Sequence, residues 1–125
     1  SLSLSLSLSL SLSLSLSRSL FLSVNKVKKK EMRENDMFYL LVTGGDGKLC
    51  GFTSFKFDFE DGDEVVYCYE LQIAAPYRGQ GLGRLLLDAL ADIGRRAAMK
   101  KVMLTCFKFN TEAQRIFRKY GFVYV

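Results

Sequence analysis

Three alternate glycines in the segment RGQGLGR, residues 78–84, are the clearest chemical feature of this sequence. The segment lies between a stretch rich in β-branched and aromatic residues and a stretch with leucines at helical spacing. Backbone N–H groups at a helix start carry partial positive charge, and glycines leave them unshielded, so such a loop can hold phosphate oxygens. The alternative is a tight strand-to-helix turn without a ligand. The spacing differs from the dinucleotide-binding fingerprint and lacks the Lys-Ser/Thr ending of a phosphate loop.

Acid–base chemistry in this chain must use carboxylates, tyrosines or the substrate, because the sequence contains no histidine. That absence excludes Ser-His-Asp and Cys-His catalysis and the HExxH zinc site. The formal net charge is +5, yet the segment from Asp58 to Glu70 is rich in acidic residues. An acidic segment in a basic protein indicates a cationic substrate. The basic residues elsewhere fit a solvated surface or a polyanionic ligand, either a phosphate-bearing cofactor or nucleic acid.

The cysteines do not indicate a metal or disulfide framework. The sequence has three cysteines, an odd number: Cys50, Cys68 and Cys106. They lie in apolar strand-like runs and lack CxxC spacing. We expect buried, reduced thiols and no metal site. No window holds eighteen continuous apolar residues, so we expect no membrane-spanning segment.

The elements that must position these groups follow from the apolar periodicity. Alternation predicts an antiparallel meander of three strands with tight turns, and helical spacing then predicts two helices. A strand, a helix and a strand in succession imply a parallel pair, so the fold class is α+β with a mixed sheet. The predicted order is strand, strand, strand, helix, strand, helix, strand, at residues 37–43, 48–59, 64–73, 82–100, 101–109, 111–120 and 122–125.

This succession of motifs resembles the GNAT superfamily of N-acetyltransferases. The resemblance rests on Arg78-x-x-Gly81-x-Gly83 between strand and helix, and on Asn110-x-x-Ala113 leading to YGF. The strings GDEVVYCYELQ and KKVMLTCFKFN further resemble its NatD branch, which acetylates the N-terminal amine of histone tails. The resemblance implies a GNAT-type α/β sandwich, acetyl-CoA as co-substrate, no metal, and transfer to an N-terminal α-amine. The expected substrates are histone tails beginning Ser-Gly-Arg-Gly.

In that family two neighbouring strands splay apart, and acetyl-CoA lies in the gap between them. The resemblance implies that the pantetheine bonds to the backbones of Leu71, Gln72 and Ile73. It implies that the pyrophosphate is held by Arg78 with the loop residues Gly79, Gln80, Gly81, Leu82, Gly83 and Arg84. Asn110 would contact the cofactor further along.

The resemblance also implies roles for side chains near the acetyl group. Asp58, Tyr67, Tyr69 and Thr105 would contact the peptide, and Glu70, Tyr69 and Tyr120 are the catalytic candidates. Glu70 would act as the general base and Tyr120 as the acid that protonates the thiolate. Strict alternation places Glu70 on the strand face opposite Tyr69, so we expect a β-bulge that lets both address one cleft.

Simpler interpretations of these residues remain open. Asp58 could be a surface acid beside a turn, and Tyr67 and Tyr69 could pack as ordinary strand residues. The YGF string with Gly121 is also a common helix-ending pattern, which would give Tyr120 a structural role.

The chain opens with an unbroken Ser-Leu repeat from Ser1 to Leu16, which a TC-dinucleotide tract would encode. We interpret residues 1–22 as a low-complexity segment that forms no element or domain, and residues 23–125 as a partial GNAT domain. The N-terminal strand and helices of the family are then missing, as in a truncated copy. We expect a cytoplasmic and nuclear monomer that needs no nucleic acid or membrane contact. The alternative functions are an inactive acetyl-CoA-binding remnant and an acetyltransferase for lysine side chains or another cationic amine.

Overall fold

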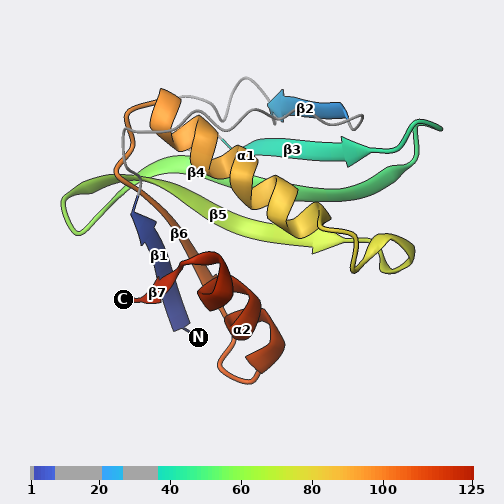
Figure 1. Cartoon of the computed structure of the whole chain (residues 1–125). Coiled ribbons are helices and arrows are strands. Elements are labelled where there is room, and N and C mark those ends of the chain that lie inside the picture. Colours follow the sequence, from blue (N-terminus) through green and yellow to red (C-terminus); the bar gives the residue numbers. More distant parts are fainter. Residues whose placement is uncertain (1, 8–20, 27–36) are drawn as a thin grey trace.

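The computed structural model describes residues 2–7, 21–26 and 37–125, which form a mixed sheet with helices packed on it. The sheet has seven strands in the order β2-β3-β4-β5-β6-β1-β7 (Figure 1). The strands are β1 (Leu2–Ser7), β2 (Phe21–Lys26), β3 (Phe38–Thr43), β4 (Leu49–Glu60), β5 (Asp63–Ile73), β6 (Lys101–Cys106) and β7 (Val123–Tyr124). The α-helices are α1 (Leu82–Arg96) and α2 (Thr111–Tyr120), and a short 3-10 helix, η2, spans Ala75–Tyr77.

The predicted meander and crossover are both present. Strands β3, β4 and β5 pair antiparallel in succession, and β6 then pairs parallel to β5 after α1. Asp61 and Gly62 make the tight turn between β4 and β5, both with positive φ. The predicted fold class, α+β with a mixed sheet, is confirmed.

Helix α1 forms because its leucines recur at helical spacing and give it one apolar face. It lies across one face of the sheet in Figure 1, and Leu86 and Leu90 are fully buried there. On the sheet side they meet buried strand residues such as Val66 and Leu104 in one core cluster. This packing fixes the start of α1, and the glycine loop before it, relative to the end of β5. Within the described residues, no helix is long and apolar enough to cross a membrane.

The expectation that the Ser-Leu repeat forms no element is wrong for its first residues. Strand β1 lies between β6 and β7 and pairs antiparallel with both. Leu4 is 0 % exposed, so the repeat contributes to the core. The prediction rejected a strand because the whole repeat is too long for one, but six alternating residues are enough.

The expectation that a strand ahead of residue 37 is missing is also wrong. Strand β2 pairs antiparallel with β3 along six residues, from Phe21 opposite Thr43 to Lys26 opposite Phe38. It supplies partners for backbone groups of β3 that would otherwise form an open sheet edge. The helices expected to be absent would fall among residues outside the described ranges.

Candidate active site

A cleft opens where β5 and β6 stop pairing. The two strands are paired from Val65 opposite Lys101 to Cys68 opposite Leu104, and β5 then continues to Ile73 with no strand on that side among the described residues. The gap holds a cavity of about 340 Å³. It is lined by Cys68, Tyr69, Glu70, Leu71, Gln72, Leu104, Thr105, Cys106, Phe107, Asn110, Ala113 and Phe117. Six residues predicted for the site therefore line one cavity: Tyr69, Glu70, Leu71, Gln72, Thr105 and Asn110.

The predicted β-bulge is present in β5 at the edge of this cleft. Ser54 of β4 lies opposite Glu70, but the next residue, Phe55, lies opposite Cys68, so Tyr69 is the extra residue. The inserted residue breaks the alternation, and Tyr69 and Glu70 both line the cleft. Both side chains are exposed to solvent.

A buried hydroxyl that the sequence did not single out stabilises the bulge. Thr53 is 0 % exposed, and its Oγ1 donates to the carbonyl oxygen of Glu70 at 2.6 Å. The same Oγ1 lies 3.2 Å from the Cys68 Sγ. Thr53 thus bonds the backbone carbonyl of a residue next to the bulge, and the Cys68 Sγ donates to the same carbonyl at 3.4 Å. Thr53 holds the backbone of the candidate base in place.

A cluster of aromatic and polar side chains lies beside the bulge. The rings of Tyr67 and Tyr69 are 5.1 Å apart, and the Tyr67 hydroxyl shares a hydrogen bond with the Thr105 hydroxyl. The Lys56 Nζ lies 5.2 Å from the centre of the Tyr69 ring. Lys56 pairs with Tyr67 across the strands, so these side chains share one face of the sheet.

Asp58 is on the same strand face as Lys56, two residues further along β4 and outside the cleft lining. Its carboxylate accepts a hydrogen bond from the Phe59 backbone N–H at 2.7 Å. The carboxylate is exposed, and its contact with a peptide stays a prediction.

The cysteines beside the cleft are poor nucleophiles. Burial raises the pKa of the Cys68 thiol to about 11, although the hydrogen bond between Thr53 and Cys68 opposes the rise. Burial also raises the pKa of Cys106, which is partly buried. All three cysteines are free, and Cys50 and Cys68 are buried as expected. Covalent catalysis needs a thiolate, so the Cys68 and Cys106 thiols are packing groups near neutral pH.

The glycine loop presents backbone amides at the start of α1. Gly79 has φ +77° and Gly81 has φ +81°, which are conformations that favour glycine. Gly81 is the N-cap, and the first helical donor is the Leu85 N–H, which reaches the Gly81 carbonyl at 3.0 Å. The N–H groups of residues 82–84 precede that bond and receive no side-chain cap, and no acidic residue lies in the first turn. The loop can therefore accept an anionic group.

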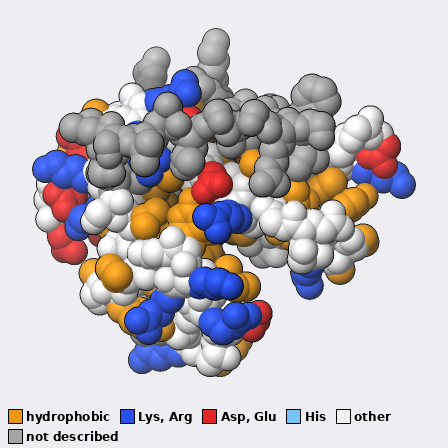
Figure 2. Space-filling view, in the orientation of Figure 1, with side chains coloured by type: hydrophobic (Ala, Val, Ile, Leu, Met, Phe, Trp, Pro, Cys, Tyr) orange, Lys and Arg blue, Asp and Glu red, His pale blue; other side chains and the backbone are white. Residues whose placement is uncertain are grey.

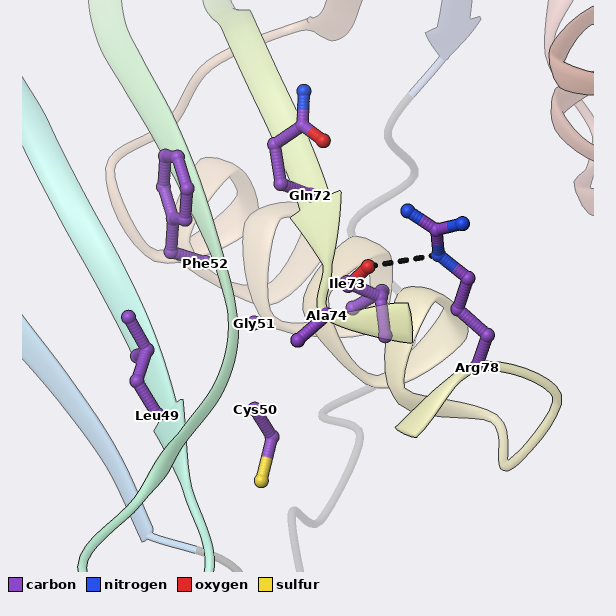
Figure 3. Close-up of a pocket in the computed structure, with 8 residues that line it drawn as sticks. All are labelled: Leu49, Cys50, Gly51, Phe52, Gln72, Ile73, Ala74 and Arg78. Carbon is purple, nitrogen blue, oxygen red and sulfur yellow. Dashed lines mark hydrogen bonds between the residues drawn. The ribbon is translucent and has the colours of Figure 1, made fainter. Parts of the chain in front are cut away.

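Arg78 lies at a second, smaller cavity of about 270 Å³ at the end of β5 (Figure 3). Its Nε donates to the Ile73 carbonyl at 2.9 Å, while the terminal guanidinium nitrogens point away from that bond. Gln72 lines both cavities, and Ile73 lines only the second. The chain thus places an arginine where β5 turns toward the glycine loop.

Asn110 and Tyr120 mark the two ends of α2. The Asn110 Oδ1 accepts from the Ala113 N–H at 3.1 Å and caps the helix. Tyr120 lies outside the cleft lining, and its hydroxyl donates to the Asp88 carboxylate of α1. Burial is the main cause that raises the Tyr120 pKa, and the Asp88 carboxylate adds to it. The catalytic role of Tyr120 stays a prediction.

The surface around α2 is basic. Figure 2 shows Lys and Arg side chains gathered in the lower part of the view, where α2 lies in Figure 1. Arg118 and Lys119 are in the last turn of α2, and Arg84 lies 5.7 Å from the Tyr120 ring. This charge favours a polyanionic ligand near the glycine loop. Within the described ranges, no cluster of three or more aspartate, glutamate or cysteine side chains could hold a metal ion.

Residues 13–122 match the Acetyltransferase (GNAT) family. Among curated relatives, the chain is 34 % identical to N-alpha-acetyltransferase 40 of Saccharomyces cerevisiae over 76 % of its own length and 39 % of that protein. It is 24 % identical to the spermine/spermidine N(1)-acetyltransferase of Bacillus subtilis, over 82 % of the chain and 70 % of that protein. The chain covers less than half the length of N-alpha-acetyltransferase 40.

Solved structures share the fold. A putative acetyl transferase from Pyrococcus furiosus superposes with a TM-score of 0.65 at 19 % identity, covering 74 % of this chain and 63 % of that one. A putative acetyltransferase, YycN, from Bacillus subtilis superposes with a TM-score of 0.61 at 22 % identity, over 70 % of this chain and 55 % of that one.

Proposed function

This chain belongs to the Acetyltransferase (GNAT) family, and we propose that it transfers an acetyl group from acetyl-CoA to the N-terminal α-amine of a protein. The observation that carries the proposal is the bulge at Tyr69, which brings a carboxylate and an aromatic side chain into one cleft. The relative from Saccharomyces cerevisiae, named N-alpha-acetyltransferase 40, supports an α-amine as the acceptor. The peptide we propose is a histone tail that begins Ser-Gly-Arg-Gly.

The residues present fit acetyl-CoA as a substrate. The unpaired edge of β5 from Leu71 to Ile73 offers backbone groups to an extended pantetheine, and the free amides at the start of α1 suit a pyrophosphate. Arg78 adds a positive charge between these two regions. The loop conformation at Gly79 and Gly81 would be strained with any side chain, which is consistent with a close approach of ligand to backbone.

The reaction we propose is direct attack by the amine on the thioester. The amine nitrogen forms a bond to the acetyl carbonyl carbon, the carbon–sulfur bond breaks, and the thiolate of CoA leaves. The nitrogen loses a proton, which Glu70 accepts. An α-amine has a pKa of about 7.7 to 8.0, so part of it is neutral near pH 7 and the base contributes a modest share of the rate. Positioning by Tyr69 and the β5 backbone supplies the larger share.

We assign peptide recognition to the sheet face that carries Tyr67 and Tyr69. Tyr67 and Tyr69 form an aromatic wall, and the exposed Asp58 carboxylate lies further along β4 on that face. An arginine near the peptide start could pair with such a carboxylate and stack on such rings. This arrangement supports a cationic peptide over a neutral one.

The test is acetylation of a Ser-Gly-Arg-Gly-Lys peptide with a free or a blocked N-terminus, followed by mass spectrometry. We expect the free α-amine alone to react. We expect Glu70→Gln to lower kcat more than KM, whereas Glu60→Gln, in the turn-proximal end of β4, leaves both unchanged. An unchanged kcat in Glu70→Gln would remove Glu70 from the role of base.

A second candidate is acetylation of another cationic amine, such as a lysine side chain or a polyamine. It is favoured by the relative named for spermine and spermidine and by the acidic turn between β4 and β5. Turnover of the blocked peptide, or of spermine, would support this candidate. Binding of acetyl-CoA without turnover of any amine would indicate an inactive remnant.

A further inference from the structure

Strand β1 fills an interior position of the sheet although it is the first element of the chain. It pairs with β6 from Leu2 opposite Cys106 to Ser7 opposite Lys101, and with β7 at Leu4 and Ser5. The Val125 N–H adds a bond to the Ser3 carbonyl at 3.0 Å. The position between β6 and β7, which we call the β1 slot, therefore supplies backbone partners on both sides.

A strand in the β1 slot packs leucines against the core on one of its two faces only. Leu4 is 0 % exposed and lies in the core cluster, and Leu6 packs against that cluster. A side chain added at Gly121 would begin 3.3 Å from the Leu6 Cδ1, so the slot is closely packed. The serines between them face the other way, and Ser3 and Ser7 are exposed.

The sequence of β1 does not define its own register. The window Leu-Ser-Leu-Ser-Leu-Ser that forms β1 recurs at every second residue, beginning at Leu2, Leu4, Leu6 and so on to Leu12. A slip by one residue would turn serines into the core, but a slip by two restores every side-chain contact. Because the pairs of residues are identical, neither packing nor backbone bonding distinguishes these registers.

We propose that the β1 slot accepts any such window of the Ser-Leu repeat, and that at high protein concentration the window comes from a second copy of this chain. In the second copy the same leucines and serines are available, so the exchanged strand makes the same contacts. Exchange of identical elements between copies requires no new interface. Within one chain the connection keeps the repeat close, so the intramolecular arrangement dominates in dilute solution.

The connection to β2 limits a slip within one chain. Five strand spacings of about 4.8 Å lie between β1 and β2, which is about 24 Å across the sheet. The end of β1 (Ser7, opposite Lys101) and the start of β2 (Phe21, opposite Thr43) also lie toward opposite ends of the strands, about 26 Å apart along β4. If residues 6–11 occupied the slot, residues 12–20 would have to span about 36 Å but can extend to only about 30 Å. A window that begins at Leu6 therefore enters the slot from a second copy.

A single charged substitution tests the register. Leu4 and Leu86 are both 0 % exposed. If the register is exchangeable, Leu4→Asp allows a second copy to supply a window without the aspartate, so at high protein concentration we expect Tm to fall by less than about 4 °C, whereas Leu86→Asp lowers it by well over 8 °C. Equal losses in the two variants would show a fixed register and overturn the proposal.

A triple variant tests whether the slot needs leucine. In Leu4→Asp, Leu8→Asp, Leu12→Asp every window of three inward leucines up to Arg18 contains an aspartate. We expect a loss of Tm close to that of Leu86→Asp. The matched control, Ser5→Asp, Ser9→Asp, Ser13→Asp, places the same charge on the outward side and should retain most of its stability. A triple leucine variant as stable as this control would overturn the proposal.

Light scattering after size-exclusion chromatography tests the second copy. We expect the mass of the unmodified full chain to rise from one copy toward two as concentration increases, and the serine control to behave alike. A mass of one copy at every concentration would overturn exchange between copies.

Discussion

Thr53 shows how one buried hydroxyl shapes the site. Its Oγ1 donates to the Glu70 carbonyl at 2.6 Å, next to the bulge. We expect Thr53→Val to lower kcat about 5- to 10-fold, the equivalent of one lost hydrogen bond, while KM for acetyl-CoA stays within about twofold. Steady-state kinetics with the free peptide would measure both constants.

The matched control for this prediction is Thr53→Ser, which keeps the hydroxyl and removes a buried methyl group. We expect it to lose about 1 kcal/mol of stability yet to keep its kcat. If Thr53→Ser and Thr53→Val lose activity in proportion to their stability, the hydroxyl has no positioning role.

The Cys68 thiol gives the fold a dependence on alkaline pH. Burial raises its pKa to about 11, so between about pH 9 and 11 the unfolded chain loses this proton and the folded chain keeps it. The folded state then binds more protons, and the free energy of unfolding falls as pH rises, by about 1.4 kcal/mol per pH unit for this group. Below pH 9 the contribution is constant.

Urea unfolding of the unmodified chain and of Cys68→Val at several pH values would measure this dependence. The difference in unfolding free energy between the two proteins should be constant up to about pH 9 and then shrink. A constant difference up to pH 11 would mean that Cys68 ionises normally in the folded state. Both proteins keep Tyr120, whose pKa is also raised, so the difference between their unfolding free energies reports Cys68 alone.

At the scale of elements, the glycine loop links backbone conformation to ligand binding. Gly81 has φ +81° at the start of α1, and Gly62 has φ +82° in the turn between β4 and β5. Alanine at either position meets no neighbouring atom and costs about 1 kcal/mol of backbone strain. We expect equal stability losses in the two variants, but a several-fold higher KM for acetyl-CoA in Gly81→Ala alone. A KM that rises equally in Gly62→Ala would indicate a general effect of destabilisation.

The elements from residue 37 onward could be predicted because each carries a strong local pattern. The phenylalanines of β4 alternate, the leucines of α1 recur at helical spacing, and Asn110 precedes α2 as a cap. The bulge could be predicted because the resemblance assigns Tyr69 and Glu70 to one cleft, which simple alternation forbids. Thr53 gave no signal, since a threonine in a strand is ordinary and its partner is distant in the sequence.

The strands before residue 37 could not be predicted from the same kind of pattern. Nothing in the Ser-Leu repeat marks where a strand begins or ends, and its place beside β6 depends on contacts about a hundred residues away. The contact of Tyr120 with Asp88 was missed for the same reason, because α1 and α2 meet only in the folded chain.

For the whole molecule, the cleft divides the sheet into two parts that share few bonds. Strands β2 to β5 form one part, and β6, β1 and β7 with α2 form the other, joined by the short parallel pairing of β5 with β6. Helix α2 has no buried residue, yet Ala113 and Phe117 line the cleft. A ligand in the cleft would therefore cover the less buried of the two α-helices.

We expect acetyl-CoA to slow hydrogen exchange in α2 at short labelling times, because few buried contacts hold this helix in the free protein. Amides in the turn at Asp61 and Gly62, at the opposite end of β5 from Ile73, should exchange at unchanged rates and serve as the internal control. At a ligand concentration of 100 times Kd, global stability should also rise by about 2.7 kcal/mol, measurable as a higher Tm. A higher Tm without slower exchange in α2 would place the ligand at the glycine loop alone, since a ligand that fills the cleft must contact α2.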